Sequence, residues 1–123
     1  MITGIVTINH EAQVRLKVRG QVGLELEIEA VIDTGFSEFL TLPPALIAAL
    51  GLVWRNRSSV ELADGNEVDL DIHQAVVEWD GQLRTIAVYA ADAAPLIGMA
   101  LLSGYELTIQ ITDSGSVTIT KLP

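Results

Sequence analysis

The sequence predicts a mainly β protein with one or two short helices, folded as a single domain over residues 1–123. Many stretches alternate apolar and polar residues, which is the period of a strand with one buried face. Valine, isoleucine and threonine are abundant, and these residues suit a pleated, half-buried surface. Turn residues separate the alternating stretches. Half of the residues are hydrophobic, so the chain can build a modest core.

The first clear element is a β-hairpin. Residues 14–19 and 24–30 alternate on both sides of a loop at residues 21–23, in which Gly23 is expected to be left-handed. This register pairs basic with acidic residues, which favours a solvated, self-neutralised sheet face over the alternative, an anion site. The expected pairs are Arg15 with Glu29, Lys17 with Glu27 and Arg19 with Glu25.

The later elements follow from turn and cap signals. Residues 43–51 begin with proline and end with glycine, which predicts a short helix. Residues 95–102 predict one or two further helical turns. Asp80-Gly81 is a strong signal for a two-residue hairpin turn. The remaining strands are predicted at residues 60–62, 67–79, 83–89, 106–112 and 117–120.

Composition excludes several classes of function. Sixteen acidic against seven basic residues give a net charge of −9, which disfavours nucleic acid and anionic membranes as partners. The absence of cysteine excludes disulfides, thiolate metal sites and a cysteine nucleophile. No apolar run reaches the roughly 18 residues of a membrane span, and the first residues do not resemble a signal peptide. We therefore expect a cytoplasmic protein without a cofactor.

The segment Val31-Ile32-Asp33-Thr34-Gly35 is the most informative for chemistry. Two β-branched residues directly before an aspartate are expected to direct its carboxylate toward the core. An unpaired charge is costly there, and the sequence offers no evident internal partner for it. Asp33 is therefore a candidate functional residue.

This segment resembles the catalytic loop of retropepsin-like aspartic proteases. The second hallmark of that family, two hydrophobic residues and a glycine that open a late helix, is matched by Leu96-Ile97-Gly98. Residues 62–67 occupy the place of the tip of the family's flap hairpin. The resemblance spans nearly the whole chain. With Phe36 after the motif, it is greatest to the small bacterial and archaeal branch.

The resemblance implies a closed β-barrel of the acid-protease type, one lobe per chain, and an aspartic endopeptidase that cleaves polypeptides as a homodimer. Two carboxylates that share one proton can activate water and protonate the leaving amide. The chain has one Asp-Thr-Gly, so a second copy must supply the other carboxylate. The resemblance implies Asp33, Thr34 and Gly35 as catalytic residues, and Phe36, Ser37, Ala63, Asp64, Gly65, Asn66, Ile97 and Gly98 as substrate-binding residues.

The resemblance also implies that residues 1–9 and 116–122 add strands to the dimer interface. Viral members carry an arginine where this chain has Met99, and many relatives carry an acidic or amide residue where it has Ala100. Ser37-Glu38 replaces the aspartate that follows the viral catalytic loop. The ion pairing that braces viral dimers is absent, so different dimer contacts are expected.

Three alternatives remain open. The chain could be a dimeric peptide-binding or scaffolding module that has lost the chemistry. It could be a monomer in which Asp33 merely caps a turn. Asp69, Asp71 and His73 alternate along one strand and could bind a metal, although an exposed polar strand face is the favoured interpretation and no metal is expected.

Overall fold

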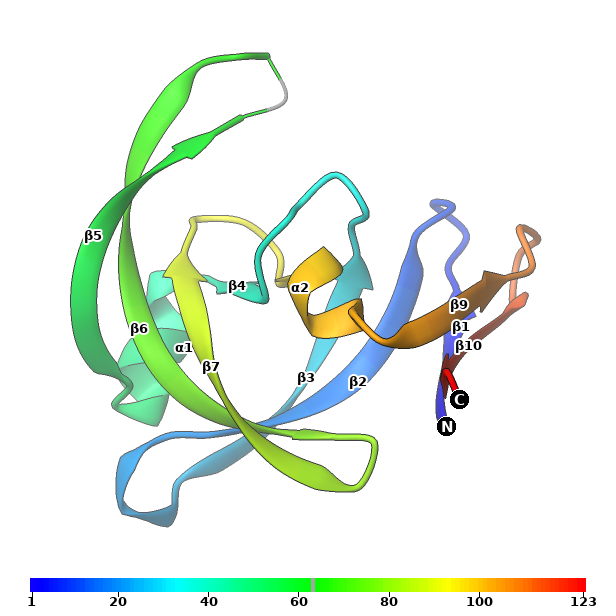
Figure 1. The fold of residues 1–123 in the computed structure, drawn as a ribbon, viewed down its shortest axis with the longest axis horizontal. Helices are drawn as coiled ribbons and strands as arrows, with labels where there is room; N and C mark the ends of the chain where they lie inside the picture. The colour runs from blue at the N-terminus through cyan, green and yellow to red at the C-terminus, as the bar shows by residue number, and fades with distance from the viewer. Residues whose placement is uncertain (63) are drawn as a thin grey trace.

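The computed structural model describes residues 1–62 and 64–123. Within these residues the protein is mainly β, with two short α-helices and one 3₁₀ turn, which confirms the predicted fold class (Figure 1). The elements are β1 (Ile2–Val6), β2 (Ala12–Arg19), η1 (Gln21–Gly23), β3 (Glu25–Ile32), β4 (Leu40–Leu42), α1 (Pro44–Leu50), β5 (Val53–Glu61), β6 (Glu67–Trp79), β7 (Gln82–Ala90), β8 (Leu96–Ile97), α2 (Met99–Leu102), β9 (Tyr105–Ile109) and β10 (Ser116–Lys121).

The described strands form one sheet in the order β5-β6-β7-β4-β8-β3-β2-β1-β10-β9. An additional pairing of β6 with β2 closes six of them, from β2 through β3, β8, β4 and β7 to β6, into a ring. Most neighbours are antiparallel, but β3 pairs with β8, and β4 with β7, in parallel. In Figure 1 the β5–β6 hairpin extends beyond this ring, on the side where the loop after β3 also lies.

The β2–β3 hairpin has the predicted register. Arg15 pairs with Glu29, Lys17 with Glu27 and Arg19 with Glu25. The Arg19 Nε atom lies 2.7 Å from a Glu25 carboxylate oxygen, and Gly23 is left-handed with φ 75°. At the next predicted hairpin turn, Asp80 and Gly81 both have positive φ, 52° and 78°, as a type I′ turn requires.

The core is built mainly by the strands of the ring and by α1, and β1 and β10 add Val6, Val117 and Ile119 to it. Trp79 and Leu16 are among the largest fully buried side chains. Helix α1 begins directly after Pro43 and ends at Gly51, whose φ of 60° gives the left-handed cap that glycine favours. Its Ile47 and Leu50 are buried and attach the helix to the sheet.

The helix predicted over residues 95–102 begins only at Met99, because Leu96 and Ile97 form β8 and pair with β3 and β4.

Two predicted strand boundaries were also wrong. Strand β5 begins at Val53 instead of residue 60, because residues 55–59 are all polar and offer no alternation from which a strand could be predicted. The strand also carries a β-bulge between Trp54 and Asn56. Strand β9 ends at Ile109 instead of residue 112, where the chain turns toward β10. Within residues 1–62 and 64–123, no helix is long and apolar enough to span a membrane.

The terminal strands pair with each other inside the chain. Strand β1 lies between β2 and β10, and β10 lies between β1 and β9, so both edges of both strands are occupied. A second copy cannot add a strand at these edges without displacing existing pairs. The neighbouring open edge belongs to β9, a strand to which the sequence analysis assigned no role at an interface.

Candidate functional site

Asp33 is held at the end of β3 by the parallel pairing of β3 with β8. The Asp33 backbone N–H donates to the Ile97 carbonyl at 2.9 Å, which extends the ladder one residue beyond the strand. Val31 is fixed in the same way by the Pro95 carbonyl at 2.9 Å. The position of the carboxylate is therefore set by the sheet.

The turn after Asp33 orients its side chain. The Gly35 N–H donates to Asp33 Oδ1 at 2.9 Å, and the Phe36 N–H donates to the Asp33 carbonyl at 3.2 Å. Asp33 is only partly buried in the single chain, so the expectation that Val31 and Ile32 would direct it into the core was wrong. Its carboxylate has no ion-pair partner within residues 1–62 and 64–123. It remains accessible for chemistry or for a second chain.

The segment of residues 33–39, here called the Asp33 loop, rests on the start of α2. The N–H groups of Gly98, Met99 and Ala100 donate to carbonyls of the loop at 2.8–3.2 Å. A Cβ at Gly98 would overlap the Glu38 carbonyl and lie 2.6 Å from a Phe36 ring carbon. Glycine at this position is therefore what allows the loop and α2 to approach so closely.

A hollow of about 180 Å³ is lined on one side by the Asp33 loop and on another by the protruding β5–β6 hairpin. The Phe36 and Tyr89 rings meet edge to face, with centroids 6.0 Å apart. Burial raises the pKa of Tyr89, and the carboxylate of Glu38 beside it raises that pKa further. We call the 180 Å³ space the loop–hairpin hollow. It is lined by Gly35, Phe36, Ser37, Glu38, Ser59, Val60, Glu61 and Tyr89.

The structure brings together only some of the expected site residues. Gly35, Phe36 and Ser37 line the hollow, and Gly98 packs beneath it. Ile97 is fully buried, so it meets the site through its carbonyl rather than its side chain. Thr34 is exposed and faces a different hollow, described below.

Three of the expected flap residues, Asp64, Gly65 and Asn66, lie in the turn between β5 and β6. Asp64 accepts hydrogen bonds from the backbone and side chain of Asn66, both at 2.9 Å, and Gly65 has a φ of 85°. Ala63 lies outside the described residues. In this chain the hollow is lined by the hairpin stem at residues 59–61 instead of the described tip residues.

Sequence reasoning missed Glu38, Tyr89 and the stem residues as part of the site. Glu38 could have been suspected from its place in the Asp33 loop. Tyr89 gives no local signal, because it reaches the loop only through the parallel pairing of β7 with β4.

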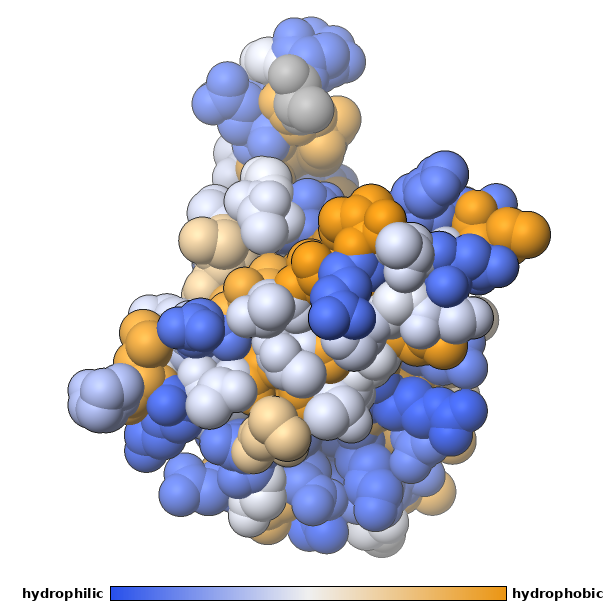
Figure 2. Space-filling view, turned by 90° about the vertical axis from the view of Figure 1, so that its right-hand side faces the viewer, coloured by the Kyte–Doolittle hydropathy of each residue, from blue (hydrophilic) through white to orange (hydrophobic). Residues whose placement is uncertain are grey.

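A second hollow, of about 320 Å³, lies on the other side of the Asp33 loop. Its apolar members include Met99, whose side chain is 48% exposed. Figure 2 shows the side of the molecule that carries β9. Hydrophobic and neutral residues are exposed across the middle of this side, and hydrophilic residues are concentrated below them. We call the hollow the Thr34 face. It is lined by Thr34, Met99, Leu102, Ser103, Gly104, Tyr105 and Leu107.

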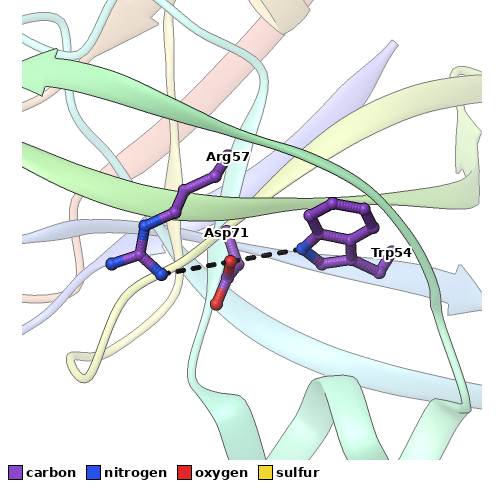
Figure 3. A network of polar contacts seen from close by, with 3 residues as sticks. All are labelled: Trp54, Arg57 and Asp71. Atoms are coloured by element: carbon purple, nitrogen blue, oxygen red, sulfur yellow. Dashed lines mark hydrogen bonds and ion pairs between the residues drawn. The ribbon is translucent and has the colours of Figure 1, made fainter.

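The carboxylates of the possible metal site are engaged by protein partners. Asp71 Oδ1 accepts from Trp54 Nε1 at 3.2 Å and lies 3.4 Å from an Arg57 nitrogen (Figure 3). Asp69 accepts from the Ser59 hydroxyl at 2.9 Å. No group of three or more potential ligands that could hold a metal is found in residues 1–62 and 64–123.

Two solved structures resemble this fold over most of the chain. EIAV protease in complex with the inhibitor HBY-793 matches with a TM-score of 0.60 at 13% identity, covering 77% of this chain and 88% of the other. A retropepsin-like aspartic protease from Rickettsia conorii matches with a TM-score of 0.58 at 13% identity, covering 99% and 91%. No protein-family model and no curated protein matches the sequence. The chain therefore has a retropepsin-like fold, as the resemblance implied.

Proposed function

We propose that this protein is an aspartic endopeptidase that acts as a homodimer, with Asp33 of each copy forming the catalytic dyad. The observation that carries the proposal is the Asp33 carboxylate, held by the β3–β8 ladder at the end of a strand in a retropepsin-like fold. It is accessible and has no cationic partner in the part of the chain that the structure describes.

A second carboxylate is required by the chemistry. Hydrolysis of a peptide bond needs a base to activate water and an acid to protonate the leaving nitrogen. Two carboxylates about 3 Å apart cannot both ionise, so one is a base while the other keeps a proton. The single Asp33 of one chain cannot supply both groups. In a homodimer, a two-fold axis close to Asp33 would bring the partner's Asp33 beside it as the second carboxylate.

The Thr34 face is the surface on which we place the second copy. It adjoins the Asp33 loop through Thr34, and its exposed Met99 and partly exposed Leu107 offer apolar area for burial. The open edge of β9 lies on the same side and offers unpaired backbone groups. In this arrangement Thr34 hydrogen-bonds across the axis to the partner's loop.

The substrate in this proposal is a polypeptide bound in an extended form near the Asp33 loop. The β5–β6 hairpin protrudes on the side where the Asp33 loop lies (Figure 1). In this proposal it closes over the peptide and excludes water, as mobile lids do. Gly35 leaves open space for the substrate backbone: in the described part of the chain, and apart from its own chain neighbours, only Asp33 Oδ1 lies within 4 Å of a Cβ added there, at 3.2 Å. Phe36 and Ser37 contribute to a side-chain pocket.

The experiment compares peptide-library cleavage by the wild type and by Asp33→Asn, from about pH 4 to 7, because a shared proton predicts a bell-shaped profile. Asparagine keeps the shape of the side chain but can neither activate water nor hold the shared proton. We expect Asp33→Asn to lower turnover by about 10²–10⁴-fold or more. Its folding stability should equal or exceed that of the wild type, since charge repulsion in the dyad is removed.

The matched control is Asp113→Asn, which removes an exposed carboxylate from the turn between β9 and β10. It should cleave as the wild type does. Equal cleavage by Asp33→Asn would contradict the proposal. Peptide binding without cleavage by either protein would favour the non-catalytic module, and a monomer at all assay concentrations would exclude the dyad.

A further inference from the structure

The loop–hairpin hollow is acidic. Among its eight lining residues are two carboxylates, Glu38 and Glu61, and no lysine or arginine. Glu38 has no ion-pair partner in residues 1–62 and 64–123. The Arg84 guanidinium lies 5.9 Å above the Phe39 ring, where it stacks rather than pairs with a carboxylate.

Glu38 is placed to act inside the hollow. It is partly buried, and its main chain is held by the Ala100 N–H at 3.2 Å. Its carboxylate lies close enough to Tyr89 to affect the titration of that phenol, and Tyr89 is 8% exposed. Both residues line the same space, so the carboxylate has a rigid aromatic neighbour there.

The size of the hollow suits a single side chain. At about 180 Å³ it is smaller than the roughly 300–1,000 Å³ of typical small-molecule sites. Phe36, Val60 and Tyr89 offer apolar surface, and the carboxylates add negative charge. A long side chain with an aliphatic stem and a cationic end matches both properties.

We propose that the loop–hairpin hollow binds a lysine or arginine side chain of the peptide substrate, and that Glu38 is the residue that selects it. This inference rests on the proposed function, because it assigns the hollow to a peptide bound beside Asp33. The ammonium or guanidinium group donates to the Glu38 carboxylate while its stem packs on the Phe36 and Tyr89 rings. The net charge of −9 also favours the approach of basic peptides and repels acidic ones.

The test uses short blocked peptides in which lysine, norleucine or glutamate occupies each position in turn. Norleucine has the lysine stem without the ammonium group. Cleavage is measured as kcat/KM with the wild type, and binding is measured by fluorescence anisotropy with Asp33→Asn, which does not depend on catalysis. At one position we expect lysine to be preferred over norleucine by about tenfold and over glutamate by more, with the preference falling as salt is added.

Glu38→Gln should reduce the lysine-over-norleucine ratio to near one in both measurements. Glu61→Gln removes the second carboxylate of the hollow, on the hairpin stem, and measures how much that carboxylate contributes to the preference for lysine over norleucine. Glu11→Gln removes an exposed carboxylate from the turn before β2 and should keep the full ratio.

The outcomes separate this inference from the proposed function. Cleavage with equal use of lysine and norleucine at every position overturns the inference and leaves the protease intact. Binding with a lysine preference that Glu38→Gln removes, but without cleavage by the wild type, supports the inference and contradicts the catalytic function. Neither binding nor cleavage of any peptide overturns both.

Discussion

Replacing Gly98 with alanine tests how the Asp33 loop is supported. The Gly98 backbone has φ −102° and ψ 179°, which alanine adopts without strain, so any cost of the substitution is steric. The new Cβ would overlap the Glu38 carbonyl and lie 2.6 Å and 2.7 Å from a ring carbon and the carbonyl of Phe36. Two of these three atoms belong to the backbone, so a change of rotamer cannot relieve the overlap.

The magnitude follows from what must move. Overpacking in a well-packed region costs about 1–3 kcal/mol. Displacing the Asp33 loop also weakens the three hydrogen bonds from Gly98, Met99 and Ala100, at about 1 kcal/mol each if lost. We expect Gly98→Ala to lower the free energy of unfolding by about 3 kcal/mol or more, which is about 10 °C in Tm for a chain of this size. Activity should fall further, because the loop carries Asp33.

The assay is urea and thermal unfolding followed by circular dichroism, at one protein concentration for all variants because dimer formation would affect stability. The control is Gly23→Ala in the β2–β3 hairpin, where φ is 75° and, apart from the chain neighbours, no atom of the described residues lies within 4 Å of the new Cβ. Gly23→Ala should lower the free energy of unfolding only by the cost of holding alanine in the left-handed conformation, about 1–2 kcal/mol. A Gly98→Ala protein as stable as Gly23→Ala would refute the steric argument.

Three further predictions concern the surfaces around the site. Thr34→Ala should weaken dimerisation and lower activity mainly at low protein concentration, as sedimentation equilibrium and dilution assays would show; a concentration-independent loss would contradict this role. Met99→Glu and Leu83→Glu both replace exposed side chains, 48% and 57% accessible, so both should fold, but only Met99→Glu should shift dimers to monomers. Equal effects of the two would move the interface away from the Thr34 face. The pKa of Tyr89 is raised in the folded chain, so as pH rises the unfolded chain releases the Tyr89 proton first. The contribution of Tyr89 to the free energy of unfolding is therefore fully present below about pH 10 and is lost as pH rises through the folded pKa. Unfolding free energies from about pH 8 to 11 should therefore fall less steeply in Tyr89→Phe, and parallel curves would refute the assignment.

The sequence by itself determined the local elements of this protein. The β2–β3 register was predictable because strand alternation and a glycine turn together allow one pairing, and Arg19 meets Glu25 as expected. The bounds of α1 followed from Pro43 and Gly51, and the Asp80-Gly81 turn followed from its dipeptide. The Asp33 segment was recognisable because its residues are consecutive.

Only the tertiary structure decided what surrounds Asp33. Glu38 and Tyr89 share a hollow because β4 and β7 pair in parallel, with Thr41 opposite Tyr89, and no local pattern encodes that pairing. The bulge at Trp54 and the partial exposure of Asp33 likewise depend on how distant strands meet. The physical reason is that turn chemistry and side-chain period act over a few residues, whereas a site is assembled from strand pairings that close long loops.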